Sequence, residues 1–229
     1  RLDPRTLHGY AAREVDGGVV YSSQGPPATF TCSAGDWVVT AVADAPAETR
    51  LDATDRLVTP GFVDVHTHLD AQIGWEPEMR PSSHHGVTTA LIGNCGVTFA
   101  PVSKPNRRYL AELMEAVEDI AADAIMDGLP WSWESYGEYL DAIQELRPAL
   151  NVVGLAGHSA IRFEAMGDRS MDKGVQATDA ELARITDLVR ESLEGGAVGF
   201  STSRFLGHRV PDGRCTLGTF AHQREMEAI

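Results

Sequence analysis

The chain has 229 residues, of which 43% are hydrophobic and 23% are charged. This composition is ordinary for a globular protein, and the length suits one domain with a small appendage. A formal net charge of −14 argues against nucleic acid and anionic membranes as partners. No apolar run approaches the ~18 residues of a membrane span, and the N-terminus lacks a signal-peptide pattern. Three widely spaced cysteines argue against a disulfide framework and favour a cytoplasmic location.

The first 56 residues are predicted to form a small β-rich region. They are rich in Val, Thr, Gly, Ala and Ser and lack helical periodicity. Strand-like segments in this region lie at 18–21 and 37–42. Its opening residues fit no expected pattern, and the chain starts at Arg1 rather than Met. We therefore expect the chain to be a fragment of a longer protein.

From residue 57 onward, apolar segments with strand character alternate with segments of helical periodicity. Strands are predicted at 62–68, 87–92, 151–156 and 197–202. Helices are predicted at 76–85, at 107–126, in the later part of 129–145, and at 220–229. A capping box, with Thr178 at the cap and Glu181 three residues later, begins one more helix that ends at a Gly-Gly pair.

Strands that alternate with helices predict parallel βα units. The chain holds four such units, whereas a closed barrel of this type has eight. The predicted fold class is therefore α/β: an incomplete (β/α)8 TIM-type barrel over residues 57–229, preceded by the β-rich region over residues 1–56. We expect the open edges of this partial barrel to favour self-association.

Two histidines separated by one residue, His66 and His68, close the first of these predicted strands. Alternate side chains of a strand share a face, so both imidazoles are expected to point the same way. Two converging imidazoles make half of a metal site. The alternative is that they are two ordinary loop histidines.

Cys95 lies in a Gly-Asn-Cys-Gly segment directly after the second predicted strand. The carboxyl ends of the strands are where βα-barrels place their chemistry, and a thiolate is a strong zinc donor. Its small neighbours leave the thiol accessible to a ligand. The alternative is a small buried apolar side chain, the commonest fate of a free cysteine. Beside His66 and His68 on the neighbouring strand, a metal-binding role is the favoured interpretation.

Two further residues are candidates for binding substrate. His158 follows the third predicted strand, where it is expected to line the site or to support a neighbouring group. Arg204 follows the fourth predicted strand, and its guanidinium suits a substrate carboxylate. A solvated surface arginine is an equal alternative. His208, shortly after Arg204, is the one remaining histidine of interest.

Together these residues resemble the amidohydrolase superfamily and, within it, the D-aminoacylase (N-acyl-D-amino-acid deacylase) branch. The segments that carry the resemblance are 58–68 with its His-Thr-His, 82–96 with its Asn-Cys-Gly turn, 99–101, 113–120, 129–135, 199–204 and 211–213. The histidine pair is typical of the whole superfamily, whereas the Asn-Cys-Gly turn is typical of the deacylases.

The resemblance implies a zinc-dependent hydrolase that cleaves the amide bond of a small-molecule N-acyl-D-amino acid. It implies that His66, His68 and Cys95 are metal ligands. The remaining histidine ligands and the acid/base aspartate of such enzymes come from later strands, so we expect them beyond Ile229. We expect this chain alone to be inactive. Two alternatives stay open: another metal-dependent amidohydrolase, such as a hydantoinase, and a non-catalytic half-barrel that serves binding or assembly.

Overall fold

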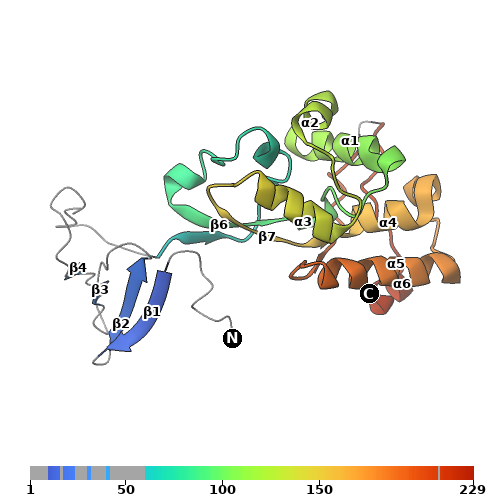
Figure 1. Ribbon diagram of the computed structural model, residues 1–229. Helices are drawn as coiled ribbons and strands as arrows, with labels where there is room; N and C mark the ends of the chain where they lie inside the picture. Colours follow the sequence, from blue (N-terminus) through green and yellow to red (C-terminus); the bar gives the residue numbers. More distant parts are fainter. Residues whose placement is uncertain (1–9, 16–17, 24–29, 32–39, 42–59, 211) are drawn as a thin grey trace. The chain divides into compact units, whose positions relative to one another are not determined.

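The computed structural model describes residues 10–15, 18–23, 30–31, 40–41, 60–210 and 212–229 (Figure 1). The chain divides into two compact units, Arg1–Pro60 and Gly61–Ile229. In the first unit β1 (Tyr10–Val15) pairs antiparallel with β2 (Gly18–Ser23), and β3 (Phe30–Thr31) pairs antiparallel with β4 (Thr40–Ala41). The predicted strand at 18–21 lies within β2. Of the one predicted at 37–42, only residues 40–41 are among the described residues.

The second unit is built on parallel strands. β5 (Phe62–Asp64), β6 (Val87–Ile92) and β7 (Asn151–Gly154) form a three-stranded parallel sheet, and β8 (Ala156–Gly157) pairs parallel with β9 (Phe200–Ser201). Only Leu155 separates β7 from β8. Its N–H donates to the carbonyl of Ile92, and the N–H of Val198 donates to that of Gly154, so backbone pairing continues across the break. The carboxyl ends of these strands therefore lie at a common edge.

Six helices lie between and after these strands in the described part of the second unit. They are α1 (Arg107–Glu118), α2 (Ala122–Gly128), α3 (Tyr136–Glu145), α4 (His158–Met166), α5 (Asp179–Glu194) and α6 (Gln223–Ala228). Short 3-10 turns are η2 (Gln72–Gly74), η3 (Ser83–His85), η4 (Asn94–Gly96), η5 (Lys104–Asn106) and η6 (Gly167–Met171). Figure 1 shows α4 lying beside α5, which contacts α6 in turn. No described helix combines the length and the apolar character needed to cross a bilayer.

Several predicted elements differ in extent. The strand predicted at 62–68 ends at Asp64, and the segment predicted as a helix at 76–85 holds only η3. The helix predicted at 107–126 is interrupted because Asp119 takes a left-handed conformation, with φ 56°, and ends α1. Helix α4 is an addition: it begins directly after β8, with no side-chain cap to signal it.

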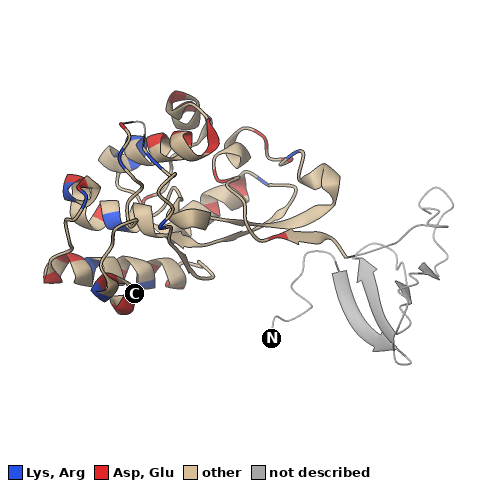
Figure 2. Cartoon of the chain, turned by 180° about the vertical axis from the view of Figure 1, so that it is seen from behind, with Lys and Arg blue, Asp and Glu red and all other residues tan. Residues whose placement is uncertain are grey.

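Buried aromatic side chains dominate the core of the second unit. Trp131 and Trp133 stack with ring centroids 5.3 Å apart, and the indole N–H of Trp133 donates to the carbonyl of Phe99 at 2.8 Å. Tyr136 and Tyr139 of α3 are 1% exposed. In Figure 2 the strands are mostly uncharged, whereas red and blue segments mark the helices, as expected for helices with one solvated face.

Candidate metal centre

The two candidate histidines lie in the extended segment that follows β5. The N–H of His66 donates to Asp64 Oδ1 at 3.2 Å, which turns the chain at the end of the strand. The imidazole rings of His66 and His68 have centroids 5.6 Å apart at an interplanar angle of 70°. The strand ends earlier than predicted, yet the spacing of two residues still brings both rings to one side of the chain.

Cys95 lies in a tight turn, η4, after β6. Gly93, Cys95 and Gly96 all have positive φ, at 76°, 56° and 76°. A side chain at Gly93 would place its Cβ 2.3 Å from the carbonyl oxygen of Leu155, so only glycine fits there. Cys95 is a non-glycine residue in the left-handed region, a strained conformation often found where a side chain must be aimed.

These three side chains meet at the carboxyl end of the strands. One ligand atom from each of His66, His68 and Cys95 lies within 4.8 Å of the others. The Nε2 atom of His66 lies 3.3 Å from the Sγ atom of Cys95. His66 is exposed and the other two are half-buried. An ion can therefore reach the cluster from solvent.

Hydrogen bonds from two neighbours join the histidine segment to the cysteine turn. The Asn94 amide donates to the carbonyls of Thr67 at 3.3 Å and Leu91 at 2.8 Å. The Thr67 hydroxyl also donates to the carbonyl of Leu91, at 2.8 Å. Because Thr67 lies between the two histidines and Asn94 precedes Cys95, these bonds fix the two donor segments against each other.

Ser201, at the end of β9, holds the cysteine turn from the other side. Its hydroxyl donates to the carbonyl of Gly93 and accepts from the N–H of Gly96 at 3.0 Å. The peptide groups before Asn94 and after Cys95 are thus bound by one side chain more than 100 residues away in the sequence. Strand β9 therefore supports the turn that follows β6.

Asp70 gives the turn a third support. Its fully buried carboxyl group accepts from the N–H of Gly93, at 3.1 Å to Oδ1 and 3.3 Å to Oδ2. Burial raises the pKa of Asp70 to about 7, although the Gly93 bond acts in the opposite direction.

No sequence pattern indicated a role for Asp70, Asn94 or Ser201. The one available signal was that each lies within two residues of a candidate ligand or at a strand end.

The electrostatics of the cluster suit a metal ion. Burial, with smaller effects of His66 and His208, lowers the pKa of His68 to about 4. Burial raises the pKa of the Cys95 thiol, and Glu118 adds to the effect. His68 therefore keeps a free lone pair at neutral pH, whereas Cys95 must lose a proton to become a ligand.

The Nδ1 atom of His68, one of the candidate ligands, is buried and has no hydrogen-bond partner among the described residues. A buried polar atom without a partner is costly unless water or an ion satisfies it. Two imidazole nitrogens and a thiol are donors that zinc prefers. The residues present therefore fit a zinc ion.

His158 lies against this turn but turns its ring into the protein. It is fully buried, its Nδ1 lies 2.9 Å from the hydroxyl of Thr202, and its Nε2 lies 2.8 Å from a carboxylate oxygen of Glu225. Glu225 also pairs with buried Arg162. Burial acts to raise the pKa of Glu225, but the bonds from His158 and Arg162 outweigh this effect and hold the pKa below its usual value. The substrate-binding role of His158 stays a prediction, and both its nitrogens have internal partners.

Arg204 and His208 lie in the segment that follows β9. Arg204 is exposed and donates to the carbonyl of Ala221 at 2.9 Å, and its predicted contact with a substrate carboxylate stays a prediction. Burial lowers the pKa of His208, and His66 adds to this effect, which places His208 near the histidine pair. The Nδ1 atom of His208 is buried without a described partner.

Parallel strands leading to a cluster of two imidazoles and a thiol are the arrangement of a metal-dependent α/β hydrolase. The profile of the amidohydrolase family matches residues 50–227. The chain belongs to this family.

Relatives place the chain in one branch of the family. It is 40% identical over 220 residues to an uncharacterized protein of Mycobacterium tuberculosis, covering 89% of this chain and 35% of that protein. It is 35% identical over 164 residues to the D-aminoacylase of Alcaligenes xylosoxydans xylosoxydans, covering 72% of this chain and 31% of the relative. The chain thus spans about a third of the length of these curated relatives.

Two solved structures resemble the fold. One is N-acyl-D-glutamate deacylase from Bordetella bronchiseptica, complexed with zinc and a phosphonate inhibitor; the TM-score is 0.64 at 27% identity, over 96% of this chain and 40% of that chain. The other is D-aminoacylase, with a TM-score of 0.53 at 26% identity, over 74% of this chain and 31% of that chain. The resemblance to the D-aminoacylase branch is confirmed. The α/β fold is confirmed too, while the count of four barrel units stays a prediction.

Proposed function

We propose that this chain carries the metal-binding part of a zinc-dependent deacylase that hydrolyses the amide bond of N-acyl-D-amino acids. The observation that carries this proposal is the convergence of His66, His68 and Cys95, with one ligand atom from each lying within 4.8 Å of the others. The similarity to D-aminoacylase and to deacylases for N-acyl-D-aspartate and N-acyl-D-glutamate supports the substrate class.

Each of the three residues has a separate task in this proposal. When bound, zinc polarises the amide carbonyl and brings the pKa of a water ligand towards about 7. His68 offers a neutral imidazole at any pH well above 4. The left-handed turn directs the Cys95 sulfur at His66, at 3.3 Å from its Nε2. The exposed side of His66 leaves room for a substrate to approach.

Cobalt substitution tests the ligand set directly. We expect Co²⁺ bound to the purified chain to give a sulfur-to-cobalt charge-transfer band, because Cys95 supplies a thiolate. Cys95→Ser is expected to abolish the band and to weaken zinc binding at least about tenfold, because loss of a residue that only supports a ligand already costs about 10–100-fold. Cys215→Ser, which alters a half-buried cysteine outside the cluster, is the matched control. An unchanged band in Cys95→Ser would contradict the assignment.

The substrate class needs its own assay. The assay uses a zinc-loaded protein that contains this chain and has the length of its relatives. We expect it to release the amino acid from N-acetyl-D-amino acids and to leave the L-enantiomers and hydantoins intact. Hydrolysis of hydantoin would favour the hydantoinase-like alternative. Zinc binding without hydrolysis of any of these amides would favour the non-catalytic half-barrel.

A further inference from the structure

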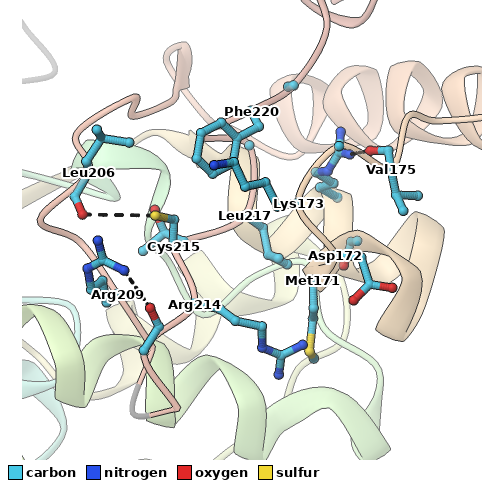
Figure 3. Close-up of a pocket in the computed structure, with 17 residues that line it drawn as sticks. Met171, Asp172, Lys173, Val175, Leu206, Arg209, Arg214, Cys215, Leu217 and Phe220 are labelled. Atoms are coloured by element: carbon cyan, nitrogen blue, oxygen red, sulfur yellow. Dashed lines mark hydrogen bonds between the residues drawn. The ribbon is translucent and has the colours of Figure 1, made fainter.

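A pocket distinct from the candidate metal centre is lined mainly by the segments that follow η6 and β9. It has a volume of about 510 Å³. Figure 3 shows Met171 and Asp172 on one side and Leu206, Arg209 and Cys215 on the other, with Lys173, Leu217 and Phe220 between them. The pocket is large enough for a small organic molecule.

One buried side chain separates this pocket from the cysteine turn. Gly218 lines the pocket, and a Cβ added there would lie 2.4 Å from the Nδ1 atom of His158. On the other side, a Cβ at Gly96 would lie 3.6 Å from the Cβ of His158. The pocket is therefore a neighbour of the candidate metal centre, and it shares none of the three candidate ligands.

The charge of the pocket is opposite to that of the chain. Its lining includes four basic side chains, Arg162, Lys173, Arg209 and Arg214, and one acidic side chain, Asp172. The chain as a whole carries a net charge of −14. Such a local reversal of sign attracts anions to one place on an otherwise repulsive surface.

Two of these four cations, Lys173 and Arg209, have no acidic partner among the described residues. Arg162 pairs with Glu225, and Arg214 pairs with Asp212. Among the described residues, no carboxylate lies within 4.0 Å of the charged nitrogens of Lys173 or Arg209. Arg209 donates only to the carbonyl of Gly213, at 2.7 Å.

Apolar side chains form the rest of the pocket. Leu217 is 4% exposed and provides a buried floor, whereas Phe220 and Leu206 are 38% and 56% exposed at the rim. The Nζ atom of Lys173 lies 4.9 Å from the centre of the Phe220 ring, which joins a cation to the apolar surface. An inorganic anion would leave these apolar side chains in water, whereas a carboxylate on an apolar body would cover them.

We infer that this pocket binds a small organic carboxylate with an apolar body. Its carboxylate provides an acidic partner for Lys173 and Arg209, and its apolar part covers Leu217 and Phe220. Acylated amino acids and free fatty acids share this chemistry. The inference stands on the pocket alone and does not require the deacylase activity.

Calorimetric titration of the metal-free protein tests the pocket, because zinc itself would hold a carboxylate. The probes are octanoate, octanamide as its uncharged counterpart, and inorganic sulfate as a charge without an apolar body. We expect octanoate to bind at least about tenfold more tightly than either of the others, since only octanoate uses both features. Equal binding of octanamide or of sulfate would overturn the inference, and so would no binding of octanoate.

Substitutions locate the site. Lys173→Met and Arg209→Met keep an apolar stem and remove the charge, so each is expected to weaken octanoate binding about fivefold or more, as for one charge-assisted hydrogen bond. Arg184→Met, at an exposed position of α5, is the control and leaves the affinity unchanged. Unchanged affinity in both pocket variants would overturn the inference. N-octanoylglycine distinguishes the sources: tighter binding than octanoate indicates acylated amino acids, and weaker binding indicates free acids.

Discussion

The hydroxyl group of Ser201 joins β9 to the carbonyl of Gly93 and to the N–H of Gly96, one on each side of Cys95. Ser201→Ala is expected to lower the free energy of unfolding by about 1–2 kcal/mol, because two partly buried backbone groups lose their partner. It is also expected to weaken zinc binding, because the turn that aims the thiol is loosened. Urea denaturation and a competitive zinc titration measure the two effects.

Ser203→Ala is the matched control. In the described part of the chain its hydroxyl accepts only from the N–H of Phe205, two residues away, at 3.2 Å. We expect a change within about 0.5 kcal/mol, as for most exposed substitutions, and an unaltered zinc affinity. Equal losses in the two variants would mean that Ser201 does not hold the turn.

The buried carboxyl group of Asp70 makes stability depend on pH. The pKa of an unfolded aspartate is about 4, whereas the folded Asp70 has a pKa of about 7. Between these values the folded state keeps a proton that the unfolded state has lost. The contribution of Asp70 to the free energy of unfolding is therefore largest below about pH 4 and decreases as the pH rises to about 7.

Asp70→Asn removes this dependence while its amide oxygen still accepts from Gly93. As the pH is raised from 5 to 8, we expect the free energy of unfolding of the variant to increase relative to that of the wild type. Urea denaturation at both pH values measures this difference. Asp127→Asn, at an exposed position on α2, is expected to follow the wild type at both pH values. A variant of Asp70 that parallels the wild type would refute the buried, protonated carboxyl group.

At the level of single residues, the sequence predicts the three candidate ligands that the structure brings together, but not the residues that support them. The two-residue spacing of His66 and His68 survives even though the strand ends early, because an extended segment still alternates its side chains. The left-handed conformation of Cys95 and the bond from Ser201 depend on contacts between distant segments. No local pattern records such contacts.

Elements with their own local signals were predictable, and those without were not. The predicted bounds of β6 are those observed, because its β-branched run ends at glycine. The capping box of Thr178 and Glu181 likewise marks the start of α5. In contrast, α4 has no capping side chain. Its formation depends on burial, since most of its residues lie in the core.

The first turn of α5 carries an acid-sensitive contact. The ion pair with Arg169, together with the bonds from Thr178, lowers the pKa of Glu181 to about 2. The unfolded value is about 4.3. The stabilisation is therefore present above that value and is lost as the pH falls through about 2.

Glu181→Gln keeps a capping side chain but loses the ion pair. At pH 7 we expect a loss of about 0.2–1 kcal/mol in the free energy of unfolding, the range for exposed pairs. Near pH 2 the difference should vanish. Glu194→Gln, at the other end of α5, removes a negative charge from a helix C-terminus and is expected not to destabilise. A loss that persists at pH 2 would exclude the ion pair as its cause.

In the second unit as a whole, β5 presents apolar side chains beside an unpaired strand edge. Among the described strands it pairs with β6 alone. Phe62, Val63 and Val65 are 57%, 60% and 66% exposed. Exposed edges of this kind favour association with another chain. The self-association predicted from the sequence remains a prediction, with this edge as its proposed site.

A charge on that edge should suppress association. In sedimentation experiments over a range of protein concentrations, we expect Val63→Lys to have a lower weight-average mass than the wild type, closer to that of the monomer. The difference should be largest at the highest concentration. Leu193→Lys is the control, because it removes exposed apolar surface from helix α5 without touching a strand. If both variants reduce association equally, general surface polarity is responsible and the edge is not.

The buried cluster of His158, Arg162 and Glu225 has a consequence for digestion of the chain by a carboxypeptidase. The four residues from Met226 to Ile229 are exposed or half-buried, whereas Glu225 is 2% exposed. Among the described residues, none of the four takes part in the side-chain hydrogen bonds of the cluster, so we expect the cluster to survive their removal. Removing Glu225 leaves the guanidinium of Arg162 buried without a partner, which lowers the free energy of unfolding by about 3–5 kcal/mol. Digestion should therefore pause at one well-defined product ending in Glu225, beyond which the second unit unravels as a whole.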